Sequence, residues 1–225
     1  MKKIVYHGSP DIVEKPLFGA GKPYNDYGLG FYCTEDPDLA KEWGVTTLRD
    51  GYANMYEIET EGLRILDLNG PDFCALHWLT VLLENRTFDM PSPLAAEARD
   101  YLKENFRVEY EPADVILGYR ADDSYFSFAQ DFINGTISYR QLTKALALGD
   151  LGQQFVLKSR EAFERIRFLG AEEALRSDWL AKKQIRDRTA RRAYFDVEKN
   201  RREKGDLYIT HILDEEMKEN DRRLR

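Results

Sequence analysis

The segment YGLGFYCTEDPDLAKEWG (residues 27–44) carries the most specific structural signals in the sequence. It opens with Gly-Leu-Gly, which is typical of a turn, and the apolar residues that follow predict a strand. Asp36 and Pro37 then predict a helix start, because a side-chain cap and a proline at the first helical position suit the unpaired backbone donors there. We expect this helix to carry Trp43 and to end at Gly44.

The rest of the chain predicts strands and helices that do not alternate regularly. A long loop is expected at 11–28. Short β-branched or alternating stretches predict strands at 3–6, 29–34, 54–60, 63–68, 114–119, 153–159 and 165–168. Helical spacing predicts helices at 72–84, 93–104, 123–132 and 138–148, and charged helices after Gly170 with a break near 204–205. The strand at 63–68 is expected to lie beside that at 54–60. This order favours an α+β fold, with a mixed, mainly antiparallel sheet and helical insertions, over a doubly wound parallel sheet.

The distribution of charge predicts two parts, a body at 1–170 and a charged helical extension at 171–225. The whole chain has a net charge of −7, which argues against a dedicated nucleic-acid-binding protein. The stretch from Trp179 to Gly205 nevertheless holds ten Lys or Arg and four Asp or Glu. A solvated helix with paired charges and a nucleic-acid surface are both compatible with this excess.

Several kinds of protein and site are not indicated by the sequence. No run of about 18 apolar residues predicts a membrane span, and the N-terminus lacks the apolar stretch of a secretion signal. Cys33 and Cys74 suggest neither a disulfide framework nor a metal site. We therefore expect a cytoplasmic protein with no metal and no membrane partner. The stretch GAGKP (19–23) lacks the spacing of a phosphate-binding loop, and Ser9 lacks the glycines of a nucleophile elbow.

Two further segments stand out beside 27–44: VYHGS (5–9) at the end of the first strand, and LGQQFVLKS (151–159). Together the three resemble the signature motifs of the ADP-ribosyltransferase superfamily, in its diphtheria-toxin and poly(ADP-ribose) polymerase branch, whose triad is His, Tyr and Glu. The resemblance spans 3–44 and 114–168. The chain is also similar to a bacterial family of ADP-ribosyltransferase-like proteins found beside antitoxin-like partners in toxin–antitoxin loci, most clearly in ADDSYFSFAQDFING and LGQQFVLKS.

The resemblance implies roles for five residues of the first two motifs. His7 would hydrogen-bond the adenine-side ribose of NAD. Gly8 would offer its backbone N–H and C=O to the nicotinamide carboxamide, with Ser9 beside it. Tyr32 would stack on the nicotinamide ring, and Trp43 would form a second aromatic wall. Taken alone, each of these residues also fits a purely structural role.

The third motif departs from the family pattern, because Gln154 stands where the family has its glutamate, with Gln153 adjacent. That glutamate binds the 2′-hydroxyl of the nicotinamide ribose. A glutamine can hydrogen-bond a hydroxyl, but it cannot act as a general base. Single transfer of ADP-ribose, hydrolysis of NAD and loss of activity are all compatible with Gln154, whereas extension to a polymer is not expected.

The resemblance thus implies an NAD-dependent mono-ADP-ribosyltransferase, the toxin of a toxin–antitoxin pair, with His7, Tyr32 and Gln154 as its catalytic residues. NAD would be a substrate, the acceptor a protein or a nucleic acid, and an antitoxin a partner. A hydrolase or phosphorylase of NAD, an inactive NAD- or ADP-ribose-binding module and a plain interaction protein are the alternatives.

Two clusters of polar residues are compatible with either a functional role or a local structural one. In the first, Asp122 is expected to cap the helix that follows it. Arg120, in the same cluster, would contact either a phosphate or the acceptor. In the second, Asn25 and Asp26 belong either to a loop over NAD or to a simple turn.

Overall fold

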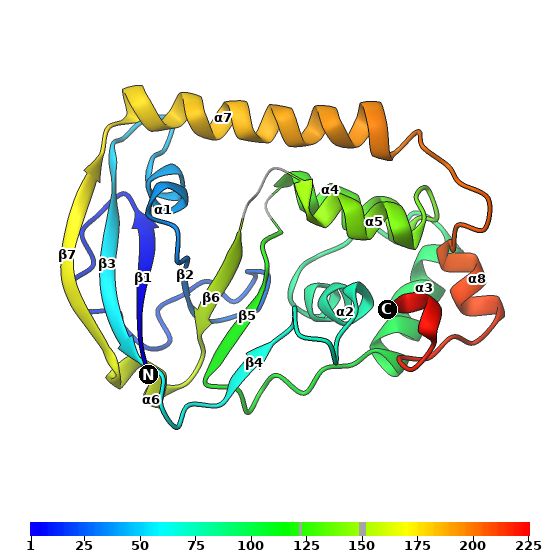
Figure 1. Ribbon diagram of the computed structural model, residues 1–225, viewed down its shortest axis with the longest axis horizontal. Helices are drawn as coiled ribbons and strands as arrows, with labels where there is room; N and C mark the ends of the chain where they lie inside the picture. The colour runs from blue at the N-terminus through cyan, green and yellow to red at the C-terminus, as the bar shows by residue number, and fades with distance from the viewer. Residues whose placement is uncertain (122, 149–151) are drawn as a thin grey trace.

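The computed structural model of the chain describes residues 1–121, 123–148 and 152–225, and only the backbone of 123–125, 197 and 198 (Figure 1). In these residues the strands form two sheets that lie side by side, with helices packed around them. The α+β fold predicted from the sequence is confirmed.

The three-stranded sheet is antiparallel throughout, in the order β1-β3-β7. Its strands are β1 (Lys2–Ser9), β3 (Gly51–Glu59) and β7 (Ile166–Ala174). Strand β7 is longer than expected, because the sequence predicts helix after Gly170. Pairing continues as far as Ala174 with Gly51, so the ladder bonds of β3 hold this polar segment extended.

The four-stranded sheet has the order β2-β6-β5-β4, and it is antiparallel except between β4 and β5. Its strands are β2 (Phe31–Cys33), β6 (Gln153–Leu157), β5 (Val115–Tyr119) and β4 (Ile65–Asp67). The expectation that 63–68 pairs with 54–60 is wrong. The backbone N–H of Arg64 donates to Asp114 Oδ2 over 2.8 Å, and the Asp114 N–H donates to Arg64 O over 2.9 Å. These bonds attach β4 to the start of β5.

Helix α1 (Pro37–Gly44) packs on β1 and β3 and begins and ends as predicted. Asp36 caps it, since its side chain accepts the N–H of Asp38 over 2.8 Å and that of Leu39 over 3.3 Å. The turn before α1 and the short strand β2 also follow the predicted order.

Further helices of the body are α2 (Ala75–Asn85), α3 (Pro93–Asn105), α4 (Asp123–Ile133), α5 (Tyr139–Leu146) and the short α6 (Arg160–Glu164). The first four share one hydrophobic core with Ile116 of β5 and Val156 of β6, and the short α6 belongs to a second cluster. Ser92 caps α3 as predicted, with its hydroxyl accepting the Ala95 N–H over 3.2 Å. Large side chains such as Trp78, Phe106 and Phe128 are fully buried among these helices.

Helix α7 (Arg176–Ala193) runs along one side of the molecule, from the end of β7 to α4 and α5 (Figure 1). It continues into a π-helical turn, η2 (Tyr194–Glu198), and the chain ends with α8 (Ile209–Asp214) and a 3₁₀ turn, η3 (Arg222–Leu224). Apolar side chains after residue 170 belong to the same core as those of the body: Ala190, Tyr194, Ile209, Ile212, Met217 and Leu224. The division at residue 170 stays a prediction.

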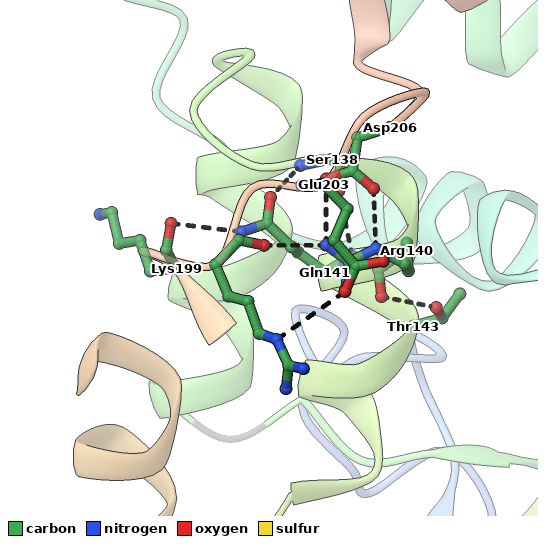
Figure 2. A network of polar contacts seen from close by, with 8 residues as sticks. Ser138, Arg140, Gln141, Thr143, Lys199, Glu203 and Asp206 are labelled. Atoms are coloured by element: carbon green, nitrogen blue, oxygen red, sulfur yellow. Dashed lines mark hydrogen bonds and ion pairs between the residues drawn. The ribbon is translucent and has the colours of Figure 1, made fainter. Parts of the chain in front are cut away.

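Figure 2 shows the polar contacts that hold the segment after α7 against α5. The Arg140 guanidinium makes two bonds to the Asp206 carboxylate, of 2.7 and 3.0 Å, and donates to Arg201 O over 2.8 Å. Gln141 Nε2 donates to Lys199 O over 3.2 Å. Because a bidentate arginine–carboxylate pair fixes direction as well as distance, the segment after α7 is held in place against α5.

Candidate functional site

Among the residues that the structure describes, one isolated backbone bridge joins the two sheets, and the strands separate immediately beyond it. The Tyr6 N–H donates to Thr34 O over 2.7 Å, and the Thr34 N–H donates to Tyr6 O over 2.9 Å. In an antiparallel ladder the next pair of this kind would be Gly8 with Tyr32. That pair is not formed. Instead His7 Nδ1 lies 2.7 Å from the Tyr32 carbonyl oxygen, so a side chain holds the two strands where the backbone ladder ends.

The backbone of Gly8 faces this opening between the sheets. Alternate residues of a strand direct their N–H and C=O groups to opposite sides. Tyr6 directs both of its groups away from β3, toward Thr34, and Gly8, two residues later, does the same. A Cβ on Gly8 would overlap Ala40 O and lie 2.8 Å from the Gly44 nitrogen. The glycine therefore lets α1 approach β1 closely while its peptide groups face the gap.

The hydrogen bond of His7 determines the tautomer of its ring. A carbonyl oxygen only accepts, so Nδ1 carries the proton and Nε2 is left as an acceptor. Burial lowers the pKa of the imidazole, which outweighs the opposite effect of the Tyr32 carbonyl. The ring also packs on Phe31, with 4.3 Å between the ring centroids. His7 is thus a neutral, rigidly held acceptor of hydrogen bonds.

The hydroxyl of Tyr32 is fully used inside the protein. It donates to Gly28 O over 2.6 Å and accepts the Tyr27 N–H over 3.1 Å. Burial raises the pKa of this phenol well above its usual value. Lys158 Nζ holds the same turn, donating to the carbonyls of Tyr27 and Leu29. The hydroxyl thus stabilises the turn, and the ring is the part of Tyr32 that a ligand could contact.

Gln154 lies on β6, opposite Gly118 of β5, and is only 5% exposed, whereas Gln153 is exposed. Its Nε2 lies 3.3 Å from Asp26 Oδ2. Its Oε1 is buried and has no hydrogen-bond partner in the part of the chain that the structure describes. Of the two adjacent glutamines, Gln154 is therefore the one at the site.

Trp43 projects from α1 and is covered on one face by an arginine. The guanidinium carbon of Arg120 lies 4.4 Å from the centroid of the indole ring. The indole Nε1 is buried and has no acceptor among the described residues. Buried polar atoms are usually paired. Trp43 and Gln154 thus leave one donor and one acceptor unpaired at the same site.

These side chains surround one cavity of about 860 Å³, within the size range of small-molecule and cofactor sites. His7, Gly8, Tyr32, Trp43 and Gln154 all line it. Ser9 is not among its lining residues. The Ser9 hydroxyl donates to Asp11 O and accepts from Asn54 Nδ2 over 3.2 Å, so it belongs to the local turn.

The loop residues Asn25 and Asp26 also lie at this cavity, since both line it. Asp26 is buried and accepts a hydrogen bond from Arg86 Nη1 over 2.8 Å. Arg120 lines the cavity as well. Asp122, the predicted cap, lies outside the described residues.

Helix α7 contributes one wall of the cavity through Lys183, Arg186 and Asp187. Arg186 forms two bonds to the buried carboxylate of Glu42 on α1, of 2.9 and 3.0 Å. The sequence motifs do not indicate these residues or Arg86. The only local signal was the basic excess of the segment, which does not indicate what it faces.

The residues that line the cavity carry a net positive charge, whereas the whole chain is negatively charged. The lining includes six basic residues and three acidic ones, although the protein carries −7 overall. The basic residues are Lys15, Lys22, Arg86, Arg120, Lys183 and Arg186, and the acidic ones are Asp26, Glu42 and Asp187. A surplus of positive charge in a concave site favours an anionic ligand.

The described part of the chain contains neither a metal-binding cluster nor a helix that could span a membrane. No group of three or more His, Cys, Asp or Glu side chains there is arranged to hold a metal ion. No helix in the same residues has both the length and the apolar character needed to cross a bilayer.

Comparison with known proteins gives one match. The sequence model of a family described as "Protein of unknown function (DUF3990)" matches residues 3–168. No curated protein and no solved structure matches the chain. The matched region ends within β7, so α7 and its cavity residues lie beyond it. Because the match covers well over half of the sequence, the chain belongs to the DUF3990 family.

Proposed function

We propose that this protein is an NAD-dependent mono-ADP-ribosyltransferase and that the cavity is its NAD site. The observation that carries the proposal is the convergence of His7, Gly8, Tyr32 and Gln154 on one cavity, although they come from three distant segments. The positive lining suits the two phosphates of NAD. The volume suits a ligand of that size.

The resemblance to ADP-ribosyltransferases gives each group a role in the proposed reaction, and the geometry of each group is compatible with that role. The Gly8 N–H and C=O face the gap where a ladder partner is missing, and they would hold the nicotinamide carboxamide. His7 Nε2 would accept a ribose hydroxyl. The ring of Tyr32 would stack on the nicotinamide, whose positive charge favours an electron-rich face.

The bond that breaks joins C1′ of the ribose to the nicotinamide nitrogen. The electron pair leaves with nicotinamide, which becomes neutral, and positive charge develops at C1′. An acceptor nucleophile then forms a bond to C1′ and loses its proton. The products are ADP-ribosyl acceptor, nicotinamide and a proton. The protein contributes position and electrostatic stabilisation in this scheme.

A direct test measures the two products of the reaction separately. The protein is incubated with NAD labelled in its adenylate part and with cell lysate, and released nicotinamide is quantified by chromatography. Labelled macromolecules are then digested with protease or nuclease to identify the acceptor class. Transfer that is lost in Tyr32→Ala, but kept in Asp114→Asn, supports the proposal. Asp114 is a suitable control because it is buried but does not line the cavity. If NAD remains intact under all conditions, the proposal is wrong.

Two alternatives give different products in the same experiment. A hydrolase or phosphorylase would release free ADP-ribose or its phosphate without labelling a macromolecule. An NAD-binding module without turnover is favoured by the neutral carboxamide of Gln154, which cannot act as a base. Calorimetry that shows NAD binding without release of nicotinamide would select it.

We also propose that the protein acts in the cytoplasm as the toxin of a toxin–antitoxin pair. Growth arrest on expression, relieved by a small neighbouring gene, is the expected result. If a Tyr32→Ala variant arrests growth as strongly as the wild type, toxicity does not depend on the cavity.

A further inference from the structure

Gln154 is coupled to a buried carboxylate from a different part of the chain. Asp26 precedes β2, is 5% exposed, and receives three hydrogen bonds. Arg86 Nη1 donates to Oδ1 over 2.8 Å, while the Ala121 N–H and Gln154 Nε2 donate to Oδ2 over 2.9 and 3.3 Å. All three partners are donors, so this arrangement fits the ionised carboxylate. Burial nevertheless raises the pKa of Asp26 above its usual value.

The carboxylate fixes the direction of the Gln154 amide. An ionised carboxylate only accepts, so Nε2 must face Asp26, and the reversed amide would place two oxygens against each other. Oε1 is therefore the free end of the amide, and it is the buried acceptor without a partner. A hydrogen bond from the amide to a charged group also draws electron density toward Oε1, which strengthens it as an acceptor.

We infer that Asp26 is a positioning residue that orients and polarises Gln154, so that Gln154 Oε1 accepts a hydrogen bond from a ligand hydroxyl. This inference rests on the proposed function, in which that hydroxyl is the 2′-hydroxyl of the nicotinamide ribose. A glutamate at position 154 would carry a negative charge itself. Here the charge is on Asp26, and it acts on the ligand through the Gln154 amide. The pair binds and orients the ribose, and neither residue acts as a base.

The first experiment compares NAD with an analogue that lacks the 2′-hydroxyl on the nicotinamide ribose. Affinities are measured by calorimetry for the wild type and for Asp26→Asn. We expect the wild type to bind NAD about tenfold more tightly than the analogue, because the analogue leaves Oε1 unpaired. Asp26→Asn removes the negative charge, so this variant should bind NAD more weakly and discriminate less between NAD and the analogue. Equal discrimination in the two proteins would overturn the inference.

A double substitution separates positioning from a general structural role. Gln154→Glu alone places two carboxylates side by side, and its NAD affinity should fall at neutral pH and recover on acidification. Asp26→Asn combined with Gln154→Glu restores an acid–amide pair of reversed direction. This protein should regain a large part of the discrimination, although the Ala121 N–H then faces an amide nitrogen. A double variant no better than the single ones would contradict coupling.

A measurement without NAD distinguishes failure of this inference from failure of the proposed function. In nuclear magnetic resonance spectra, the side-chain amide signals of Gln154 should shift as Asp26 titrates, and Asp26→Asn should abolish the shift. Asp114→Asn, the matched buried control, should leave it unchanged. If the wild type does not bind NAD but this coupling persists, the proposed function fails and the positioning role stands. If the Gln154 amide signals do not change as Asp26 titrates, the positioning role itself is wrong.

Discussion

His7 Nδ1 lies 2.7 Å from the backbone oxygen of Tyr32, and this bond takes the place of the next rung in the ladder between the two sheets. It keeps the strands together at the point where they separate to form the cavity. The neutral imidazole is therefore part of the fold as well as of the candidate site.

The first prediction concerns the stability of the protein in acid. Burial holds the pKa of His7 below the value of 6.5 expected in the unfolded chain. Between these two pKa values the unfolded state binds more protons, so the free energy of unfolding falls as the pH is lowered through this range. His7→Asn can still donate to Tyr32 O but does not titrate there. Urea denaturation from pH 7.5 to 5 should show a shallower loss in the variant, and an equal slope would contradict this assignment.

The second prediction separates the hydroxyl of Tyr32 from its ring. Tyr32→Phe leaves the Gly28 carbonyl and the Tyr27 N–H without their partner, which should cost about 1–3 kcal/mol in the free energy of unfolding. The ring is kept, so NAD affinity should change by only a few fold. Tyr32→Ala should lower that affinity more than tenfold. Calorimetry that finds both variants equally impaired would place the binding role on the hydroxyl.

The third prediction tests the close contact between β1 and α1. Gly8→Ala places a methyl group against Ala40 O and should cost about 1–3 kcal/mol of stability. Any shift of β1 away from α1 also moves the peptide groups that face the cavity, so NAD affinity should fall. Gly70→Ala is the milder comparison, because its new methyl group would meet only Asp67 O, at 3.1 Å, and a shift of a few tenths of an ångström relieves that contact. Similar losses in both variants would remove the special role of Gly8.

The fourth prediction concerns the ion pair between α1 and α7. Glu42 is buried and accepts two bonds from Arg186. Glu42→Gln should cost about 1–3 kcal/mol, less than for a fully buried pair, since the Arg186 side chain is 26% exposed. Asp196→Asn breaks an exposed pair with Arg192 and should cost about 0.5 kcal/mol or less. Urea denaturation measures both, and equal losses would show that burial of Glu42 does not matter.

The sequence predicts well those parts of the fold that depend on local signals. The caps at Asp36 and Ser92 and the helices that follow them need only neighbouring residues, and both were found as expected. The partner of β4 was predicted wrongly. A strand of three residues has too few side chains to indicate its neighbour, and Asp114, which attaches it, lies 50 residues away.

The same distinction applies to the candidate site. His7, Tyr32 and Gln154 were identified through motifs, and they line one cavity. The pairs Arg186 with Glu42 and Arg86 with Asp26 join residues 144 and 60 positions apart. Such pairs leave no local pattern, because the spacing of charges along one segment does not show what that segment will face. The sequence indicates Asp26 only as a loop residue, because its hydrogen bond with Gln154 joins positions 128 residues apart.

Helix α7 connects the cavity with the C-terminal segment. Its 18 residues span about 27 Å, with Lys183 and Arg186 near its middle at the cavity, and the segment that follows it is held against α5. An α-helix of this length moves largely as one rigid element. Because one continuous helix joins the two places, the position of the C-terminal segment on α5 also helps to fix where Arg186 lies at the cavity.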